Sequence, residues 1–429
     1  MIRTFSTTAG GWQAELDALL ERKQVTPLEI EQRVSAIIAD VKARGDAALF
    51  EYTERFDGYR PASLVIDEAE IAAAAAQVDP SLLEALVTAA KRIEDFHRRQ
   101  IEETWTYEGE HGVLLGQKIT PLDRVGVYVP GGRNAFPSTV LMDVIPARLA
   151  GVPEIVMVTP TPGGQVEPVL LAAAHIAGVR RIYRLGGAQA VAALAFGTAS
   201  VPKVDKVIGP GNIYVATAKR LLLGTIGIDS IAGPSEIMVV ADSGAEPRIV
   251  AVDLLSQAEH DPEASAMLVT PDAAFAEQVA AALAEEAAKL PRAAVVTRSL
   301  VEHGAIIVTR DLTEAFEVVN RVAPEHLELM LKDARSHLDR VRNAGAIFLG
   351  YQTPEAIGDY VAGPNHTLPT GSTARFYSPL GVYDFVKRSS IIEFNQTALK
   401  ALGEQAITLA RSEELEAHAR SVEYRLRAE

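Results

Sequence analysis

The sequence predicts an α/β protein with mainly parallel sheets in two domains. From residue 125 onward, short β-rich runs alternate with helical stretches, which is typical of βαβ units. The predicted strands are residues 125–129, 154–158, 181–185, 206–208, 236–240, 266–270 and 305–308. A chain of 429 residues is also too long for one ordinary core, which favours two domains.

These patterns divide the chain into four parts. A helical N-terminal region, residues 1–125, is expected to pack with the domain of residues 236–380. Residues 126–235 and 236–380 are the two α/β domains, joined near residues 232–236, and residues 381–429 are a helical tail. The runs 154–158 and 236–240 both begin Glu-Ile and continue with Val and Met, which hints at a duplicated α/β unit.

The N-terminal region carries two helix signals. Apolar residues recur on one helical face between Ile30 and Val41, and Gly45 ends the pattern. Asp79 and Pro80 supply an N-cap and a first-turn proline for a second helix that runs towards Arg99. We expect both helices to serve as scaffold.

The tail is predicted to end in an amphipathic helix. Ser412 is the expected N-cap, with Glu413 and Glu414 in the first turn, where the helix dipole favours acidic groups. The apolar face of this helix is formed by Leu415, Ala419, Val422 and Leu426. Such a face needs a surface to pack against, and a second subunit is one candidate.

The composition excludes several classes of protein. A net charge of −15 opposes non-specific binding to nucleic acid, a polyanion. The absence of cysteine removes thiolate nucleophiles and thiolate metal ligands. No signal-like apolar segment opens the chain, and no run of about 18 apolar residues could span a membrane. We therefore expect a cytoplasmic protein without membrane or nucleic-acid partners.

Three glycine-rich loops follow predicted strands, at residues 130–132, 186–189 and 209–212. Glycine allows close approach of a ligand to the backbone, and open α/β sheets bind ligands at strand carboxyl ends. None of the loops matches the dinucleotide fingerprint, so a purely structural role is the alternative. The polar residues Tyr128, Gln189 and Asn212 beside these loops favour ligand contact.

A first polar segment, residues 256–261, contains Gln257 and His260. On a helix, residues three apart share a face and can converge on one metal ion. The equally weighted alternative is a solvated helix end before Pro262.

A second segment places Glu325 and His326 side by side after Pro324. An adjacent carboxylate and imidazole suit two proton transfers with separate roles. The structural alternative is a helix N-terminus in which Glu325 favours the dipole.

A third segment, residues 358–371, is rich in Gly and Pro and carries Asp359 and His366. An irregular polar loop of this kind is typical of a functional site. His418 in the tail helix is the remaining candidate, although a lone helical histidine is more often a surface residue. Asp, two neutral His and Gln around Zn²⁺ would leave about one positive charge, which suits a site open to substrate.

Taken together, these motifs resemble the histidinol dehydrogenase family. They occur in the family's order over about residues 100–420: GVYVPGG (126–132), GPGN (209–212), AGPSE (232–236), SQAEHD (256–261), APEHLE (323–328), GDY (358–360), GPNH (363–366), LPTG (368–371), STARF (372–376) and SPLGVYDF (378–385).

The resemblance implies a four-electron oxidation of L-histidinol to L-histidine through L-histidinal, with two NAD⁺ and one Zn²⁺ per subunit. It also implies two related, incomplete Rossmann-like domains, the first with the NAD⁺ loops and the second with the zinc and catalytic residues. The tail is expected to swap between the subunits of a homodimer.

The family's roles carry over residue by residue. Glu325 and His326 resemble the catalytic bases: His326 would take the alcohol proton and Glu325 would activate water. The zinc ligands would be Gln257, His260, Asp359 and, from the other subunit, His418. The substrate contacts would be these four residues with Ser235, His326, His366 and Glu413, and the NAD⁺ contacts would be Tyr128, Gln189 and Asn212.

Three other interpretations stay open at this point. A zinc hydrolase would use Glu325 on a metal-bound water and would need no NAD⁺. A related zinc- and NAD-dependent dehydrogenase would act on another small amino alcohol or polyol. A non-catalytic assembly protein would use the metal and the tail only to hold a dimer together.

Overall fold

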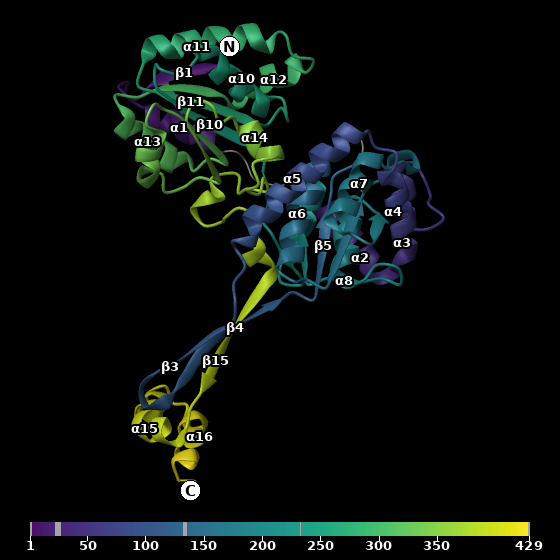
Figure 1. Cartoon of the computed structure of the whole chain (residues 1–429), viewed down its shortest axis with the longest axis vertical. Coiled ribbons are helices and arrows are strands. Elements are labelled where there is room, and N and C mark those ends of the chain that lie inside the picture. The colour runs from purple at the N-terminus through teal and green to yellow at the C-terminus, as the bar shows by residue number, and fades with distance from the viewer. Residues whose placement is uncertain (1, 22–26, 132–134, 232, 428–429) are drawn as a thin grey trace.

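The computed structural model describes residues 2–21, 27–131, 135–231 and 233–427. Gly132 and Ala232, which belong to two of the motifs above, lie outside these ranges. The described chain forms two α/β lobes and a long arm that ends in a helical hairpin (Figure 1). The predicted α/β class with mainly parallel sheets is confirmed.

The first lobe is built on a six-stranded sheet that is parallel except at one edge. Its strand order is β2 (Val65–Ile66), β7 (Ile182–Arg184), β6 (Glu154–Thr159), β5 (Arg124–Tyr128), β8 (Lys206–Ile208) and β9 (Gly227–Ile228). The edge strand β2 comes from the N-terminal region and pairs antiparallel with β7. The four strands that the sequence predicted here, β5 to β8, are all present.

The second lobe contains a six-stranded sheet that is parallel throughout. Its order is β1 (Arg3–Ser6), β12 (Ala305–Val308), β11 (Ser265–Thr270), β10 (Glu236–Ala241), β13 (His326–Met330) and β14 (Ala346–Leu349). Five strands of each sheet follow the same third-second-first-fourth-fifth order, which confirms two related Rossmann-like units. The similar runs 154–158 and 236–240 are β6 and β10, which hold different places in that order.

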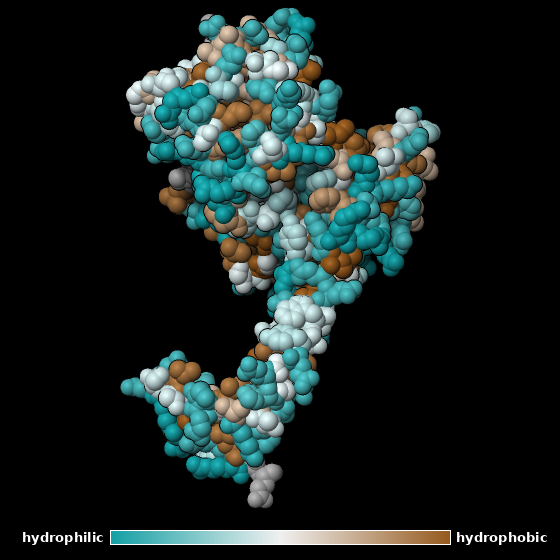
Figure 2. Space-filling view, turned by 60° about the vertical axis from the view of Figure 1, so that its left-hand side comes forward, coloured by the Kyte–Doolittle hydropathy of each residue, from teal (hydrophilic) through white to brown (hydrophobic). Residues whose placement is uncertain are grey.

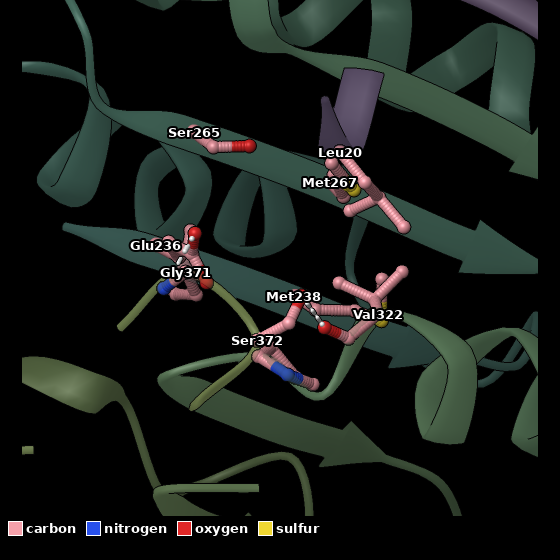
Figure 3. A pocket seen from close by; sticks show the side chains of 10 residues that line it. Leu20, Glu236, Met238, Ser265, Met267, Val322, Gly371 and Ser372 are labelled. Atoms are coloured by element: carbon pink, nitrogen blue, oxygen red, sulfur yellow. Dashed lines mark hydrogen bonds between the residues drawn. The ribbon is translucent and has the colours of Figure 1, made fainter. Parts of the chain in front are cut away.

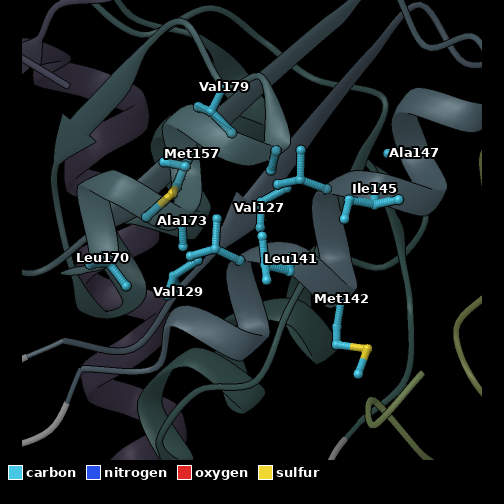
Figure 4. Close-up of a cluster of buried hydrophobic side chains, with 14 of the residues drawn as sticks. Val127, Val129, Leu141, Met142, Ile145, Ala147, Met157, Leu170, Ala173 and Val179 are labelled. Carbon is cyan, nitrogen blue, oxygen red and sulfur yellow. The ribbon is translucent and has the colours of Figure 1, made fainter. Parts of the chain in front are cut away.

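Helices cover both faces of the first sheet: α2 (Leu28–Arg44), α3 (Asp46–Asp57), α4 (Glu68–Ala75), α5 (Pro80–Arg98), α6 (Pro137–Leu149), α7 (Pro168–Ala177), α8 (Gly187–Phe196) and α9 (Ile213–Leu222). Figure 4 shows one of its two apolar clusters, in which Val127 of β5 and Leu141 of α6 are fully buried. Val34 of α2 and Ile93 of α5 are buried in the same lobe. The expectation that residues 1–125 pack with the second domain is therefore wrong for α2 to α4, whereas α5 also contacts that domain, since Arg92 donates to the Val361 and Ala362 carbonyls.

The second sheet is covered by α1 (Trp12–Leu20), α10 (Pro247–Ala258), α11 (Ala273–Ala287), α12 (Ala293–His303), α13 (Leu312–Val322) and α14 (Glu355–Tyr360). Of the N-terminal region, β1 and α1 join this lobe, where Leu16 is fully buried. No helix in the described ranges is long and apolar enough to cross a membrane.

The two N-terminal helix signals are confirmed. Helix α2 ends at Gly45, whose φ of 55° lies in the region that only glycine adopts freely. Helix α5 starts at Pro80, and the Asp79 carboxylate accepts hydrogen bonds from the first-turn backbone, including one of 2.9 Å from the Ser81 N–H.

A three-stranded antiparallel arm extends from the lobes, with strand order β15 (Val386–Glu393), β4 (Leu114–Pro121) and β3 (Trp105–Glu108). Its far end carries α15 (Gln396–Ser412) and α16 (Glu416–Arg427), which pack together as a hairpin. Figures 1 and 2 show that this hairpin stands well away from both lobes. The tail is therefore part strand, and the prediction of a purely helical tail is wrong for residues 386–393.

The start of the last helix was also predicted wrongly. Ser412 is the final residue of α15, and its hydroxyl donates to the Leu409 carbonyl at 2.7 Å. Glu414 has a φ of 60° and forms the turn before α16 begins at Glu416. The predicted apolar face still packs, because Val422 and Leu426 lie against Gly403 of α15.

The arm's attachment depends on Phe385, which is fully buried in the first lobe while its carbonyl accepts from the Leu122 N–H at 2.9 Å. We predict that Phe385→Ala costs about 3–5 kcal/mol of unfolding free energy and lowers Tm on the order of 10 °C, because a large buried cavity remains. Thermal unfolding checks this. Phe376→Ala is the control, since Phe376 is 72% exposed and its loss should leave Tm unchanged.

Candidate functional site

The pair Glu325–His326 lies at the amino-terminal end of β13, buried between the lobes' facing sides. The helix N-terminus considered for these residues is wrong, because a strand begins at His326. Strand β10 runs beside it and holds both side chains through one residue, Glu236. The Glu236 N–H donates to the Glu325 carboxylate at 2.8 Å, and the Glu236 carbonyl lies 2.9 Å from His326 Nδ1.

This contact sets the proton position on His326. A carbonyl oxygen only accepts, so Nδ1 carries the hydrogen and the neutral ring keeps its lone pair on Nε2. Burial lowers the pKa of His326, which favours the neutral ring. Nε2 has no hydrogen-bond partner among the described residues. It is therefore available to accept a proton from a ligand.

Two carboxyl groups of α14 face His326 Nε2. The nearest oxygens of Glu355 and Asp359 lie 3.7 Å and 4.0 Å from it. Burial, with the charge of Asp359, raises the pKa of Glu355 to about 7, and burial raises the pKa of Asp359 to about 6. Burial also raises the pKa of Glu325 well above its usual range. These raised pKa values indicate several acidic groups buried close together. A bound cation would offset the repulsion between their ionised forms.

The donor set fits a metal ion. His326, Glu355 and Asp359 each place a ligand atom within 4.8 Å of the others. Gln257 is buried in the last turn of α10, and its carbonyl oxygen has no hydrogen-bond partner among the described residues. His260 is an exposed residue beyond the helix end, so it does not share a helical face with Gln257 as predicted. The His260 N–H donates to the Gln257 carbonyl at 3.1 Å, so the two residues stay together where the helix ends.

A second layer of buried carboxyl groups supports α14. The Glu328 carboxylate accepts the Glu355 N–H at 2.7 Å, at the start of this helix. Burial and the neighbouring Asp253 raise the pKa of Glu328 to about 9, so Glu328 is protonated at neutral pH. Ser256 of α10 donates to Glu355 at 3.3 Å. These contacts hold the helix that carries Asp359 against the helix that carries Gln257.

A pocket of about 410 Å³ opens in front of His326. Its wall combines α5, β13, β14, α14 and the loop of residues 364–368, and includes Phe96, Gln100, His326, Phe348, Asp359, His366 and Tyr383. Burial lowers the pKa of His366 to about 4, so this imidazole is neutral. Ser235 precedes β10, and its carbonyl accepts from the Ser265 N–H at 2.9 Å. The volume suits a small polar substrate.

A smaller cavity of about 20 Å³ lies behind the pair, between β10, β11 and residues 371–372 (Figure 3). Glu236 and Gly371 meet here, and the Gly371 N–H donates to the Glu236 carboxylate at 3.2 Å. This space holds about one water molecule and no substrate. Its contacts tie the 371–372 loop to the residue that positions Glu325 and His326.

The three residues predicted to contact NAD⁺ lie at the carboxyl edge of the first sheet. The Tyr128 hydroxyl accepts the Gly187 N–H at 3.1 Å, and the buried Gln189 lies in the first turn of α8, which begins at Gly187. Asn212 lies after the neighbouring strand β8 and caps α9 by accepting from the N–H groups of Tyr214 (3.0 Å) and Val215 (3.2 Å). Two glycine-rich loops thus lie at the edge where open α/β sheets bind ligands.

Glu413 and His418 are not brought to this pocket within one chain. Glu413 directly follows α15 and His418 lies on α16, at the far end of the arm (Figure 1). Both are exposed. Within one chain, Gln257 and Asp359 lie on the neighbouring helices α10 and α14, His260 follows α10, and the fourth predicted ligand lies apart.

Several site residues escaped the sequence analysis. Glu236 acts mainly through its backbone, which no side-chain pattern reveals. Glu355 stands four residues before Asp359, a helical spacing that could have drawn attention to it. Glu328 and Asp253 are buried acidic residues in otherwise apolar segments, a signal that was available but not used.

Comparisons with known proteins agree with this geometry. A family model described as histidinol dehydrogenase matches residues 20–426. The curated histidinol dehydrogenase of Geobacter metallireducens is 56% identical over 418 residues, covering 97% of this chain and 96% of the relative. That of Pseudomonas fluorescens Pf-5 is 54% identical over 428 residues, covering 99% and 97%.

A solved structure gives the same result. The crystal structure of histidinol dehydrogenase from Elizabethkingia anophelis superposes with a TM-score of 0.95 at 35% identity, covering 99% of this chain and 98% of that one. Fold, motif order and full-length similarity agree, and the chain belongs to the histidinol dehydrogenase family.

Proposed function

We propose that this chain catalyses the NAD⁺-dependent oxidation of L-histidinol to L-histidine through L-histidinal, the last step of histidine biosynthesis. The observation that carries the proposal is the buried pair Glu325–His326, with the free Nε2 of His326 lying 4.0 Å from Asp359 in the wall of a pocket of substrate size. The full-length similarity to histidinol dehydrogenases supports the substrate. We place the reaction in the cytoplasm, with the other steps of amino-acid synthesis.

We further propose that Gln257, His260 and Asp359 hold one Zn²⁺. Support comes from the unpartnered Gln257 oxygen and from the raised carboxyl pKa values around Asp359, both of which a cation would satisfy. Glu355 is a further oxygen donor at the same place. When bound, Zn²⁺ holds the imidazole and amine of the substrate, and NAD⁺ accepts hydride.

The protein's own part is to move protons. His326 is neutral and presents Nε2 to the pocket, so it accepts the proton of the substrate alcohol in the first oxidation. Glu325 serves the second oxidation, in which its carboxylate takes a proton from the water that adds to the aldehyde. Two bases held by one backbone segment can act in turn without rearrangement of the strand.

The remaining contacts position the ligands. Ser235, His366 and Glu413 are proposed to contact the substrate, and Tyr128, Gln189 and Asn212 to contact NAD⁺. Because Glu413 and His418 are remote within one chain, we propose that a second copy of the chain supplies them through a swapped tail. The exposed apolar side chains on the arm and hairpin, among them Trp105 and Leu409, support such a partner.

The decisive assay is NADH formation from L-histidinol. We expect two NADH per histidinol, because both oxidations occur in one pocket, and loss of turnover after a chelator removes the metal. Added Zn²⁺ should restore it. Turnover without NAD⁺ would indicate a hydrolase instead, and turnover of other amino alcohols in preference to histidinol would indicate a different dehydrogenase.

The pH dependence tests Glu325. Because its pKa is raised, the Glu325 carboxyl stays protonated to higher pH than an ordinary glutamate. The fraction in the basic, deprotonated form therefore increases towards alkaline pH, and kcat for histidinal should increase with it. His326, with a lowered pKa, is already neutral in this range. Glu325→Gln should lower kcat about 10²–10⁴-fold and remove this rise. The exposed Glu317→Gln serves as control, and a flat wild-type profile would contradict the assignment.

Mixed dimers test the swapped tail. His260→Ala and His418→Ala protomers should each be inactive alone, since each lacks one proposed zinc ligand at every site. After mixing and subunit exchange, a heterodimer has one site with both ligands intact, so about a quarter of wild-type activity should return. No recovery in mixtures that demonstrably exchange subunits would exclude a ligand from the second chain.

A further inference from the structure

Two loops with different ligands meet on one helix of the first lobe. The loop of residues 209–212, proposed to contact NAD⁺, lies against Asp143 of α6, and the loop of residues 363–367, which carries His366, bonds to Met142 and Asp143 of the same helix. Asp143 is completely buried and is not part of the proposed chemistry. Its position between the loops is the feature that requires an explanation.

The NAD⁺ loop is fixed at Gly209 from three sides. The Gly209 N–H donates to Asp229 at 2.8 Å, and its carbonyl accepts from Lys219 Nζ at 3.1 Å. Asp143 Oδ2 lies against its Cα, where an added Cβ would come within 3.0 Å of that oxygen. The φ of +103° at Gly209 also excludes a side chain, so the close approach of Asp143 depends on glycine.

The substrate loop is fixed to the same two residues of α6. The Thr367 hydroxyl donates to Asp143 Oδ1 at 3.1 Å. The Asn365 amide donates to the Met142 carbonyl at 2.7 Å and accepts the Thr367 N–H at 2.8 Å. His366 lies between these two anchors, so its backbone is held on both sides.

The buried charged groups around Asp143 do not favour the stability of the fold. Lys219 and Asp229 form a buried ion pair, which leaves Asp143 without a cation of its own. Burial and the charge of Asp229 raise the pKa of Asp143 to about 8, so this carboxyl is protonated at neutral pH. A buried acid of this kind costs free energy that an apolar residue would not.

We propose that Asp143 is a positioning residue that braces the NAD⁺ loop and the substrate loop against each other through Gly209 and Thr367. The inference rests on the proposed ligands of the two loops. Asp143 touches neither ligand and acts only by fixing the backbone on each side. One buried carboxyl group thereby sets the distance between the two binding sites.

The test compares Asp143→Ala with Asp143→Asn in the full-length, zinc-loaded enzyme. The binding of NAD⁺ alone and of L-histidinol alone is measured by isothermal titration calorimetry, beside KM and kcat. Asp143→Ala removes both the hydrogen bond to Thr367 and the packing of Oδ2 against Gly209, so it should weaken both ligands about tenfold. Asp143→Asn keeps the shape and both polar positions, so it should bind both ligands within about twofold of wild type.

Val144→Ala is the matched control, because Val144 is a buried neighbour on α6 that contacts neither loop through a hydrogen bond. It should lower Tm and leave both dissociation constants unchanged. If Asp143→Ala lowers Tm with both dissociation constants intact, or if Asn fails to rescue, the brace is refuted. Failure of the proposed function would be recognised separately, because the wild-type enzyme itself would then form no NADH from L-histidinol.

A second pair covers the case in which Asp143→Ala does not fold. Thr367→Val removes the hydroxyl at nearly constant volume, and Thr367→Ser keeps it. Valine should weaken both ligands, NAD⁺ included, and serine should restore them. An effect of valine on L-histidinol alone would show that Thr367 serves only its own loop, which would overturn the coupling.

Discussion

The site depends on the parallel pairing of β10 with β13. In this register Ile237 lies opposite His326, so the peptide groups of Glu236 fall beside Glu325 and His326. One N–H then holds the carboxylate and one carbonyl selects the ring tautomer. A slip of one residue would turn both side chains to the other face of the sheet. The positions of Glu325 and His326 are therefore fixed by the pairing of these two strands.

The surrounding electrostatics follow from burial. Carboxyl groups from α14, β13 and the preceding loop are crowded into a region that water reaches poorly, and their pKa values rise together. The helices α10 and α14 are joined through the same groups. The protein thus maintains an energetically costly arrangement, which the proposed Zn²⁺ would make less costly.

The sequence predicted the seven strands with continuous apolar runs, because such strands are buried on both faces of a parallel sheet. It missed β13, in which Glu328 interrupts the apolar pattern, and the arm, whose exposed strands have no buried face to produce a period. Residues with side-chain chemistry, such as Gln257 and Asp359, were found from motifs. Glu236 and Asp143 were not, since their roles arise from backbone groups and from contacts between distant segments.

The two sheets share one topology but present opposite edges to the ligands. The first sheet offers its carboxyl edge, as its glycine loops predicted, while Glu325 and His326 stand at the amino edge of the second. The rule that open α/β sheets bind ligands at the carboxyl ends of their strands therefore locates only the proposed NAD⁺ contacts and not Glu325 and His326. The residues proposed to bind NAD⁺ and those proposed to bind substrate stand on different sheets, so neither unit alone contains the whole proposed site.

The arm has a consequence for the newly made chain. Its outer strands β3 and β15 are sheet edges, and Trp105, Tyr107 and Ile392 stand exposed along it. Exposed edges with aromatic side chains readily pair with the wrong neighbour, and Lys387 and Arg388 on β15 are charges of the kind that discourage it. If two copies pair through their arms as proposed, newly made chains would face a competition between that pairing and aggregation, so the yield of paired chains would depend on how quickly each arm finds its partner.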